Sequence, residues 1–341
     1  MNHYKIDLGH PGYFKEECLA LFKLLNDCSD STFEITLDNK LNPWILSQPI
    51  PFEITSNGKP GDITLYTSGT TGIPKPITKN LMSEKKTSRG MGKSEDIWLL
   101  TYSPSRWAGL SVYLHCVKNK SKLEIPSDLS IESICKHLDL VTHISMTPSL
   151  FKKMILSGLI SPKSNISQVT FGGEYATQKT LDEARYFFPQ ARISHIYATT
   201  ELGDVCGSSD GLEGYKSLPG DIDENGELVI NGIKTGDIWE KTNNRYYFKS
   251  RLSEMISVGG AKVFPIQIED IIKNLAGIQD VKVYGLHSSL LGQIVCADIV
   301  TKRTSLDLTK ELRLLLPKYA IPKINIVEEI ELTKAGKKSR I

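Results

Sequence analysis

The stretch THISMTPSLFKKMILSGL, residues 142–159, joins a short β-rich run to a helical pattern of apolar residues. The run THISM predicts a strand, and SLFKKMILSGL predicts a helix after it. The same alternation recurs on both sides, where DIWLLTYS (96–103) indicates a strand and TLDEARYFF (180–188) a helix. Strands that alternate with helices predict an α/β fold, in which a mainly parallel sheet is covered by helices.

The pattern changes near residue 220. Apolar alternation surrounds two pairs of turn-forming residues, Asn225–Gly226 and Asn243–Asn244, which predicts antiparallel hairpins in a β-rich subdomain. A shorter α+β pattern follows, with helices in PIQIEDIIKNLA and TKELRLLLPKY and strands in VKVYGL and IVCADIV. We therefore predict a large N-terminal domain over 1–252 and a small C-terminal α+β domain over 253–341.

Composition limits the class of protein. The chain has 341 residues, 40% hydrophobic and 23% charged, with a net charge of +2. So small a charge argues against nucleic acid or an acidic membrane as partner. The six cysteines form no CxxC pair, so we expect reduced thiols. No segment reads as a signal peptide or membrane span, which predicts a soluble, cytoplasmic protein. The segment YFKEECLALFKLLNDC (13–28) predicts an amphipathic helix.

The stretch LYTSGTTGIPK, residues 65–75, has the composition of an anion-binding loop. Gly69 and Gly72 allow backbone N–H groups to converge on an oxyanion, and Lys75 adds a positive charge. Further donors are the hydroxyls of Thr67, Ser68, Thr70 and Thr71. The alternative is a surface turn rich in threonine and serine, because short glycine-rich motifs often match by chance.

Five further motifs follow this loop in order. They are FGGE (171–174), YATTE (197–201), KTGD (234–237), SRLSEMISVGGAKVFPIQIE (250–269) and TKAGKKSR (333–340). Together with TSGTTGIPK, they resemble the motifs of the adenylate-forming superfamily of acyl-CoA synthetases, peptide-synthetase adenylation domains and luciferases. The resemblance implies that ATP activates a carboxylic acid as its acyl-adenylate, that pyrophosphate leaves, and that a thiol then accepts the acyl group. It implies ATP, Mg²⁺ and either CoA or the phosphopantetheine of a carrier protein.

The resemblance also implies roles for residues around the nucleotide. The loop 67–75 would bind the β- and γ-phosphates, and Thr200 would donate to the α-phosphate. Tyr197 would stack on the adenine, and Glu201 would bind Mg²⁺. The segment beside the adenine would be Gly172, Gly173 and Glu174. Taken alone, Tyr197 would be interpreted as a core tyrosine and Glu201 as a surface carboxylate.

Three further elements complete the implied site. Asp237 and Arg251 would bind the ribose, although the sequence TGD alone indicates only a turn. Lys337 would be the adenylation lysine, which contacts the attacking carboxylate and the α-phosphate. In the family, the C-terminal domain then rotates about a hinge, here at Ser253. That rotation would bring Gly259 and Gly260 to the thiol channel, so the small domain is expected to be mobile.

The chain departs from the family pattern at five positions without losing a chemically essential group. They are Pro76, Ala198, Ser250, Ser253 and Glu331. The hinge sequence SEMISVGG and the PKPI after the loop resemble those of o-succinylbenzoate–CoA ligases. Only 64 residues precede Leu65, so we expect a short form of the family.

The acid pocket is predicted from two segments, SRWAGL (105–110) and MTPSL (146–150). Our hypothesis is that Arg106 points inward and pairs with a second carboxylate of the acid. The alternative is an outward, solvated arginine.

Three functions remain open from the sequence. The leading one is a CoA ligase for a small carboxylic acid, o-succinylbenzoate-like or otherwise aromatic or dicarboxylic. The first alternative is an enzyme that loads a carrier protein. The second is a non-catalytic nucleotide-binding relative, which the retained Lys75, Glu201, Asp237 and Lys337 disfavour.

Overall fold

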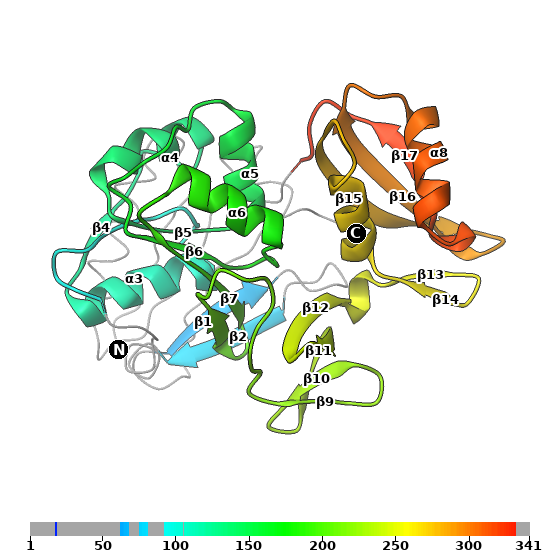
Figure 1. The fold of residues 1–341 in the computed structure, drawn as a ribbon. Helices are drawn as coiled ribbons and strands as arrows, with labels where there is room; N and C mark the ends of the chain where they lie inside the picture. The colour runs from blue at the N-terminus through cyan, green and yellow to red at the C-terminus, as the bar shows by residue number, and fades with distance from the viewer. Residues whose placement is uncertain (1–17, 19–61, 68–74, 81–91, 105, 332–341) are drawn as a thin grey trace, which may run out of the picture. The chain divides into compact units, whose positions relative to one another are not determined.

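The computed structural model describes Cys18 and residues 62–67, 75–80, 92–104 and 106–331. The chain divides into two compact units, Met1–Glu213 and Gly214–Ile341 (Figure 1). The boundary predicted after residue 252 lies inside the second unit, and it stays a prediction. The helix predicted over 13–28 lies outside the described residues except for Cys18, which is helical and buried.

A six-stranded sheet forms the centre of the first unit. Its neighbouring strands are parallel except for the last pair, which is antiparallel. In spatial order the strands are β4 (Lys122–Glu124), β3 (Ile97–Leu99), β5 (His143–Met146), β6 (Gln168–Phe171), β7 (Arg192–Thr199) and β8 (Gly203–Ser208). The predicted α/β fold with a mainly parallel sheet is therefore confirmed.

Helices cover this sheet, with α4, α5 and α6 on one side and α3 on the other in Figure 1. Three of them begin at a hydroxyl residue that accepts a hydrogen bond from the N–H three residues on, namely Ser130, Thr147 and Thr177. The helices are α3 (Trp107–Asn119), α4 (Ile131–His137), α5 (Pro148–Leu156) and α6 (Gln178–Phe187), with a 3₁₀ turn η1 (Leu138–Leu140) after α4.

Aromatic packing fixes α5 and α6 to the sheet. Phe151 of α5 is fully buried, and its ring centroid lies 5.4 Å from that of Phe171 on β6. It also lies 5.9 Å from the ring of Phe188, which follows α6. Both ring pairs are tilted, and aromatic pairs at these distances add stability beyond the area that they bury. The stretch that predicts the fold therefore supplies both a strand of the sheet and the helix anchored to it.

The predicted phosphate loop connects two paired strands. Strand β1 (Asp62–Thr67) and strand β2 (Lys75–Asn80) are antiparallel, and Thr67 and Lys75 are register partners. Residues 68–74 themselves lie outside the described part of the chain.

The second unit begins with a four-stranded antiparallel sheet. Its turns contain the predicted residues: Asn243 and Asn244 join the last two strands with φ values of 49° and 62°. Gly226, with φ of 82°, precedes the second strand. The strands are β9 (Asp221–Ile222), β10 (Glu227–Ile230), β11 (Ile233–Thr242) and β12 (Arg245–Arg251). The hairpins predicted in this region are confirmed.

The rest of the second unit has the predicted α+β pattern. Its sheet has the order β14-β13-β16-β15, with β17 parallel to β16. The elements are η2 (Leu252–Glu254), β13 (Ile256–Val258), β14 (Ala261–Val263), α7 (Pro265–Lys273), β15 (Ile278–Ser288), β16 (Gly292–Thr301), α8 (Ser305–Leu315), η3 (Lys318–Ala320) and β17 (Lys323–Ile326). Across the described residues of both units, no helix is long and apolar enough to cross a membrane.

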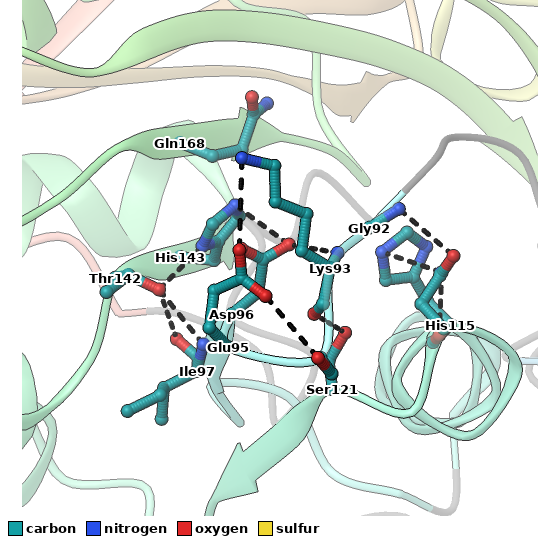
Figure 2. A network of polar contacts seen from close by, with 12 residues as sticks. Gly92, Lys93, Glu95, Asp96, Ile97, His115, Ser121, Thr142, His143 and Gln168 are labelled. Atoms are coloured by element: carbon teal, nitrogen blue, oxygen red, sulfur yellow. Dashed lines mark hydrogen bonds and ion pairs between the residues drawn. The ribbon is translucent and has the colours of Figure 1, made fainter.

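A polar network lies where β3 and β5 begin (Figure 2). The Asp96 carboxylate accepts a hydrogen bond from the Lys93 N–H at 2.7 Å and lies 3.6 Å from His143 Nε2. Thr142 Oγ1 accepts from the Ile97 N–H at 2.9 Å and lies 2.7 Å from His143 Nδ1. Burial lowers the pKa of His143, and the negative charge of Asp96 acts in the opposite direction. These contacts join the starts of β3 and β5 at the amino edge of the sheet.

Candidate active site

The carboxyl ends of the parallel strands lie together at the edge opposite the network of Figure 2. Open α/β sheets bind ligands at this edge, in the loops that follow the strands. The segments that follow β3, β5, β6 and β7 begin at residues 100, 147, 172 and 200, and α5 starts directly after residue 147. The motifs FGGE and YATTE thus end two adjacent strands, β6 and β7.

The FGGE loop is packed against its neighbours. A Cβ atom on Gly172 would lie 3.1 Å from Cγ1 of Ile196 on β7, so the glycine allows this close approach. Gly173 has a φ of 79°, a conformation that glycine adopts without strain. The Glu174 carboxylate accepts a hydrogen bond of 2.9 Å from the N–H of Ser149, in the first turn of α5. Negative charge is favourable there, so Glu174 holds the loop against the helix.

Tyr102 belongs to this edge, although none of the sequence motifs contains it. It is buried just after β3, and its hydroxyl donates to the carbonyl oxygen of Gly172 at 3.4 Å. Burial raises its pKa well above the usual range; the Ser145 hydrogen bond lowers it, and the charge of Glu174 raises it further. The phenol therefore stays protonated. In the sequence it lies inside the stretch 96–103 that predicts a strand, so only the end of β3 at Leu99 in the structure places it at this edge.

The YATTE segment ends β7 and turns outward. Tyr197 is half-buried on the strand. Thr199 Oγ1 accepts a hydrogen bond of 3.0 Å from the Leu202 N–H, which closes the turn that contains Thr200 and Glu201. Thr200 is half-buried, whereas Glu201 is exposed. The turn therefore presents one hydroxyl and one carboxylate at the carboxyl edge.

The Glu201 carboxylate suits a Mg²⁺ ion that arrives with a nucleotide. Mg²⁺ usually keeps several waters and takes one or two carboxylates together with phosphate oxygens. Within the part of the chain that the structure describes, no group of three or more His, Cys, Asp or Glu residues could hold a metal ion. This donor set fits an ion shared with phosphates better than one held in a protein cage.

Arg106, in the segment predicted to form the acid pocket, occupies the N-cap position of α3 without a side-chain capping hydrogen bond. Burial lowers the pKa of its guanidinium, and no ion pair with a described residue offsets that burial. The next residue, Trp107, has the Lys79 ammonium 4.4 Å from its ring centroid, a cation–π contact. Gly109 lets the helix approach the preceding loop, because a Cβ there would lie 2.3 Å from the Ser103 carbonyl oxygen. The predicted pocket segment therefore includes a half-buried positive charge.

Asp237 and Arg251 form a pair in the second unit. They are register partners on β11 and β12, and Arg251 Nε lies 3.1 Å from Asp237 Oδ1. Asp237 is 1% exposed, whereas the Arg251 side chain is 47% exposed. The arginine therefore forms an ion pair with a buried carboxylate across the two strands. Their role at a ribose stays a prediction.

The predicted thiol-channel glycines form the turn between β13 and β14. Gly259 and Gly260 are exposed and have φ values of 55° and 88°. The Gly259 N–H donates to the Leu291 carbonyl oxygen at 2.9 Å, which fixes one end of the turn.

The remaining predicted site residues lie at the ends of the phosphate loop or outside the described residues. Thr67 and Lys75 lie on β1 and β2, at the two ends of the phosphate loop. Those outside the described residues are Ser68, Gly69, Thr70, Thr71, Gly72 and Lys337. The structure brings together Tyr102, Gly172 and Glu174 in the first unit, and Asp237 and Arg251 in the second.

The sequence and the structure are similar to those of known proteins over most of the chain. A 2-succinylbenzoate–CoA ligase of Staphylococcus epidermidis is 25% identical over 324 residues, which cover 81% of this chain and 68% of that protein. The structure is similar to that of an E. coli MenE variant with bound OSB-AMS, with a TM-score of 0.72 and 19% identity over 95% of this chain and 83% of that one.

The o-succinylbenzoate CoA synthetase (MenE) of Bacillus subtilis is a further structural relative. Its complex with the acyl-adenylate intermediate OSB-AMP gives a TM-score of 0.62, and its complex with ATP and magnesium ion gives 0.65. Both are 21% identical over 81% of this chain, and the alignments cover 67% and 68% of those chains. At this level of identity the structural likeness shows the α/β fold with its smaller second domain.

Two family profiles match the sequence. The AMP-binding enzyme profile matches residues 29–232, more than half of the chain. The profile of the AMP-binding enzyme C-terminal domain matches residues 267–337. The chain therefore belongs to the AMP-binding enzyme family, within the adenylate-forming superfamily that its ordered motifs resemble.

Proposed function

We propose that this enzyme activates a small carboxylic acid with ATP and transfers the acyl group to CoA. The observation that carries the proposal is the ordered set of family motifs, two of which end adjacent parallel strands at the ligand-binding edge. The proposed acid is o-succinylbenzoate-like, because the curated relative is a 2-succinylbenzoate–CoA ligase. The cytoplasmic location and the absence of nucleic-acid and membrane partners stay predictions of the sequence.

The first step joins two anions, so the site must supply positive charge and hydrogen-bond donors. A carboxylate oxygen of the acid bonds to the α-phosphorus, the bond from that phosphorus to the bridging oxygen breaks, and pyrophosphate leaves. Lys75 binds the departing phosphates, Thr200 donates to the α-phosphate, and Lys337 neutralises the attacking carboxylate. When bound, Mg²⁺ neutralises charge on the phosphate oxygens, and Glu201 is the residue that would hold it.

The second step transfers the acyl group. The CoA thiolate attacks the acyl carbonyl carbon, the carbon–oxygen bond to the phosphate breaks, and AMP leaves with the electron pair. The backbone at Gly259 and Gly260 would line the path of the thiol, because it is exposed and carries no side chains. The two steps would therefore use different residues of the second unit, Lys337 first and the glycine turn afterwards.

The acid is proposed to lie near Tyr102 and Arg106. The hydroxyl of the buried, neutral Tyr102 contacts the FGGE backbone, and the Glu174 carboxylate of the same loop is engaged by the N–H of Ser149 in α5. A partly desolvated guanidinium such as that of the half-buried Arg106 is stabilised by an anion. Arg106 would therefore favour an acid with a second carboxylate, as o-succinylbenzoate has.

The test is pyrophosphate release across a panel of carboxylic acids, with CoA or with phosphopantetheinylated carrier protein as acceptor. We expect release with o-succinylbenzoate-like acids and a thioester with CoA. If a thioester forms with the carrier protein and not with CoA, the acceptor is the carrier protein. If no acid of the panel causes release of pyrophosphate, the proposal that the protein activates a carboxylic acid is refuted.

The variant Lys337→Ala separates the two steps. It is expected to lower the rate of adenylation by about 10²–10³-fold, because one stabiliser of the developing charge is lost. It should still form the thioester when the acyl-adenylate is supplied. Unchanged pyrophosphate release would refute the role assigned to Lys337.

A further inference from the structure

We propose that Glu227 is a positioning residue for ribose recognition: it fixes the backbone that presents Asp237. The inference rests on the proposed function, in which Asp237 accepts hydrogen bonds from the ribose hydroxyls of ATP. It adds a residue that lies on another strand and belongs to none of the six motifs.

The strand pairing explains why Asp237 needs support. In β10 and β11, Val229 pairs with Lys234 and Glu227 with Ile238, so the register shifts between these two pairs. Residues 235–237 of β11 therefore face a single residue of β10, and the strand bulges there. A bulge removes regular backbone partners from the residues that it contains. Asp237 is thus carried by a segment whose position the β10–β11 ladder does not set.

The Glu227 side chain supplies the missing partner. It is 6% exposed, and its Oε1 accepts a hydrogen bond of 2.9 Å from the N–H of Gly236, next to Asp237. Gly236 has a φ of 74°, so its N–H points in a direction that few other residues would give. A buried carboxylate is costly unless its oxygens are engaged. The hydrogen bond from Gly236 therefore stabilises the buried carboxylate and at the same time fixes the backbone of the bulge.

Charged neighbours hold the other end of Glu227. Lys234 Nζ lies 3.3 Å from Glu227 Oε2 and 2.8 Å from Asp223 Oδ2. Asp223 Oδ1 in turn accepts a hydrogen bond of 2.9 Å from the backbone N–H of Glu227. The hydrogen bond from Lys234 is the main cause of a lowered pKa at Asp223, and the same contact raises the pKa of Lys234. Glu227 is therefore fixed in both its backbone and its side chain.

The remaining contacts of the bulge lead to Asp237. Thr235 Oγ1 donates to the Leu228 carbonyl oxygen at 2.9 Å and accepts from the Asp237 N–H at 3.2 Å. The Asp237 carboxylate is held by Arg251 on the opposite strand. The backbone of Asp237 is thus held by the bulge contacts on the β10 side and by its ladder pairing with Arg251 on the β12 side, where the Arg251 side chain also contacts its carboxylate. Removing the Glu227 carboxylate takes away the contact that holds Gly236 on the β10 side, while the pairing of Asp237 with Arg251 remains.

The test compares the binding of ATP and 3′-deoxyATP by calorimetry in the full chain. The wild type should bind ATP roughly tenfold more tightly, because a hydrogen bond between a hydroxyl and a carboxylate is lost with the deoxynucleotide. Asp237→Asn should reduce this preference, and so should Glu227→Ala, by at least about threefold. Glu227→Gln should keep most of it, because the amide oxygen can still accept from Gly236.

The matched control is Glu240→Gln. Glu240 lies on β11 as well and pairs with Lys249, away from the bulge. It should keep the preference for ATP whatever its effect on the melting temperature. A merely structural role of Glu227 would weaken the binding of both nucleotides equally and leave their ratio unchanged.

The two Asp237 and Glu227 variants together show whether the role of Glu227 is wrong or whether the assignment of Asp237 to the ribose is wrong. If Asp237→Asn loses the preference and Glu227→Ala keeps it, the positioning role is overturned. If Asp237→Asn keeps it, the ribose assignment is overturned and the inference with it. Should Glu227→Ala not fold, Glu227→Asp decides, because it keeps the charge but shortens the reach to Gly236. An unchanged ratio in that variant overturns the proposal.

Discussion

The two edges of the six-stranded sheet carry similar side chains that make different contacts. At the amino edge, the polar groups of Asp96, Thr142 and His143 contact one another and nearby backbone (Figure 2). At the carboxyl edge, Glu201 is exposed, and the burial of Arg106 is offset by no ion pair with a described residue. Residue type alone therefore does not separate a structural group from a binding group. We propose that the partners that each group already has separate them.

The largest expected contrast is between two carboxylates. Glu201→Gln should lower kcat/KM for pyrophosphate release by on the order of 10²-fold, because Mg²⁺ would lose its carboxylate ligand. Asp96→Asn should leave kcat/KM close to that of the wild type. It should reduce the free energy of unfolding by about 1 kcal/mol, because the bonds to Lys93 and His143 weaken.

Both quantities are measured for each variant, by a pyrophosphate assay and by denaturant unfolding. The contrast between the edges fails if Asp96→Asn loses as much turnover as Glu201→Gln. It also fails if Glu201→Gln retains full turnover at limiting Mg²⁺.

A smaller effect is expected at the acid pocket. Arg106→Ala should raise KM for dicarboxylic acids about tenfold, because one charged contact worth about 1.5 kcal/mol would be lost. KM for monocarboxylic acids and for ATP should change little. Lys93→Ala is the matched control, since it removes an exposed cation at the amino edge. An equal rise of KM for both classes of acid would show that Arg106 contributes to packing rather than to recognition.

The smallest expected effect is a change of stability with pH, caused by His143 at the amino edge. Burial lowers the pKa of His143 in the folded chain, so the unfolded chain binds the proton first as the pH falls. The stability that neutral His143 contributes is therefore complete above its unfolded pKa of about 6.5 and decreases as the pH falls toward the folded pKa. Tyr102 at the other edge should add no such dependence, because its pKa is raised.

The measurement is the melting temperature between pH 8 and pH 5 for the wild type and for His143→Gln. The difference between the two curves should shrink as the pH falls below 6.5. A difference that grows toward low pH would mean that the charge of Asp96 outweighs burial and that the pKa of His143 is raised rather than lowered.

Local patterns predicted much of this fold, because they report contacts close in sequence. The strand and helix of 142–159 and the turn at Asn243–Asn244 depend on the residues themselves. Contacts between distant segments left no such pattern. Glu174 accepts from Ser149, and Glu227 supports Gly236 across a bulge. The sequence therefore marked the positions of the candidate site but not the residues that hold it in shape.

The close approach at Gly109 limits how the proposed acid pocket could be redesigned. A side chain at that position would meet the Ser103 carbonyl oxygen at 2.3 Å and the Tyr102 carbonyl oxygen at 2.9 Å. Neither is the movable end of a side chain, so the loop itself would have to shift. A library for new substrates would therefore vary Arg106 and Trp107 and keep glycine at position 109. The same helix that offers positions for redesign also sets a limit on them.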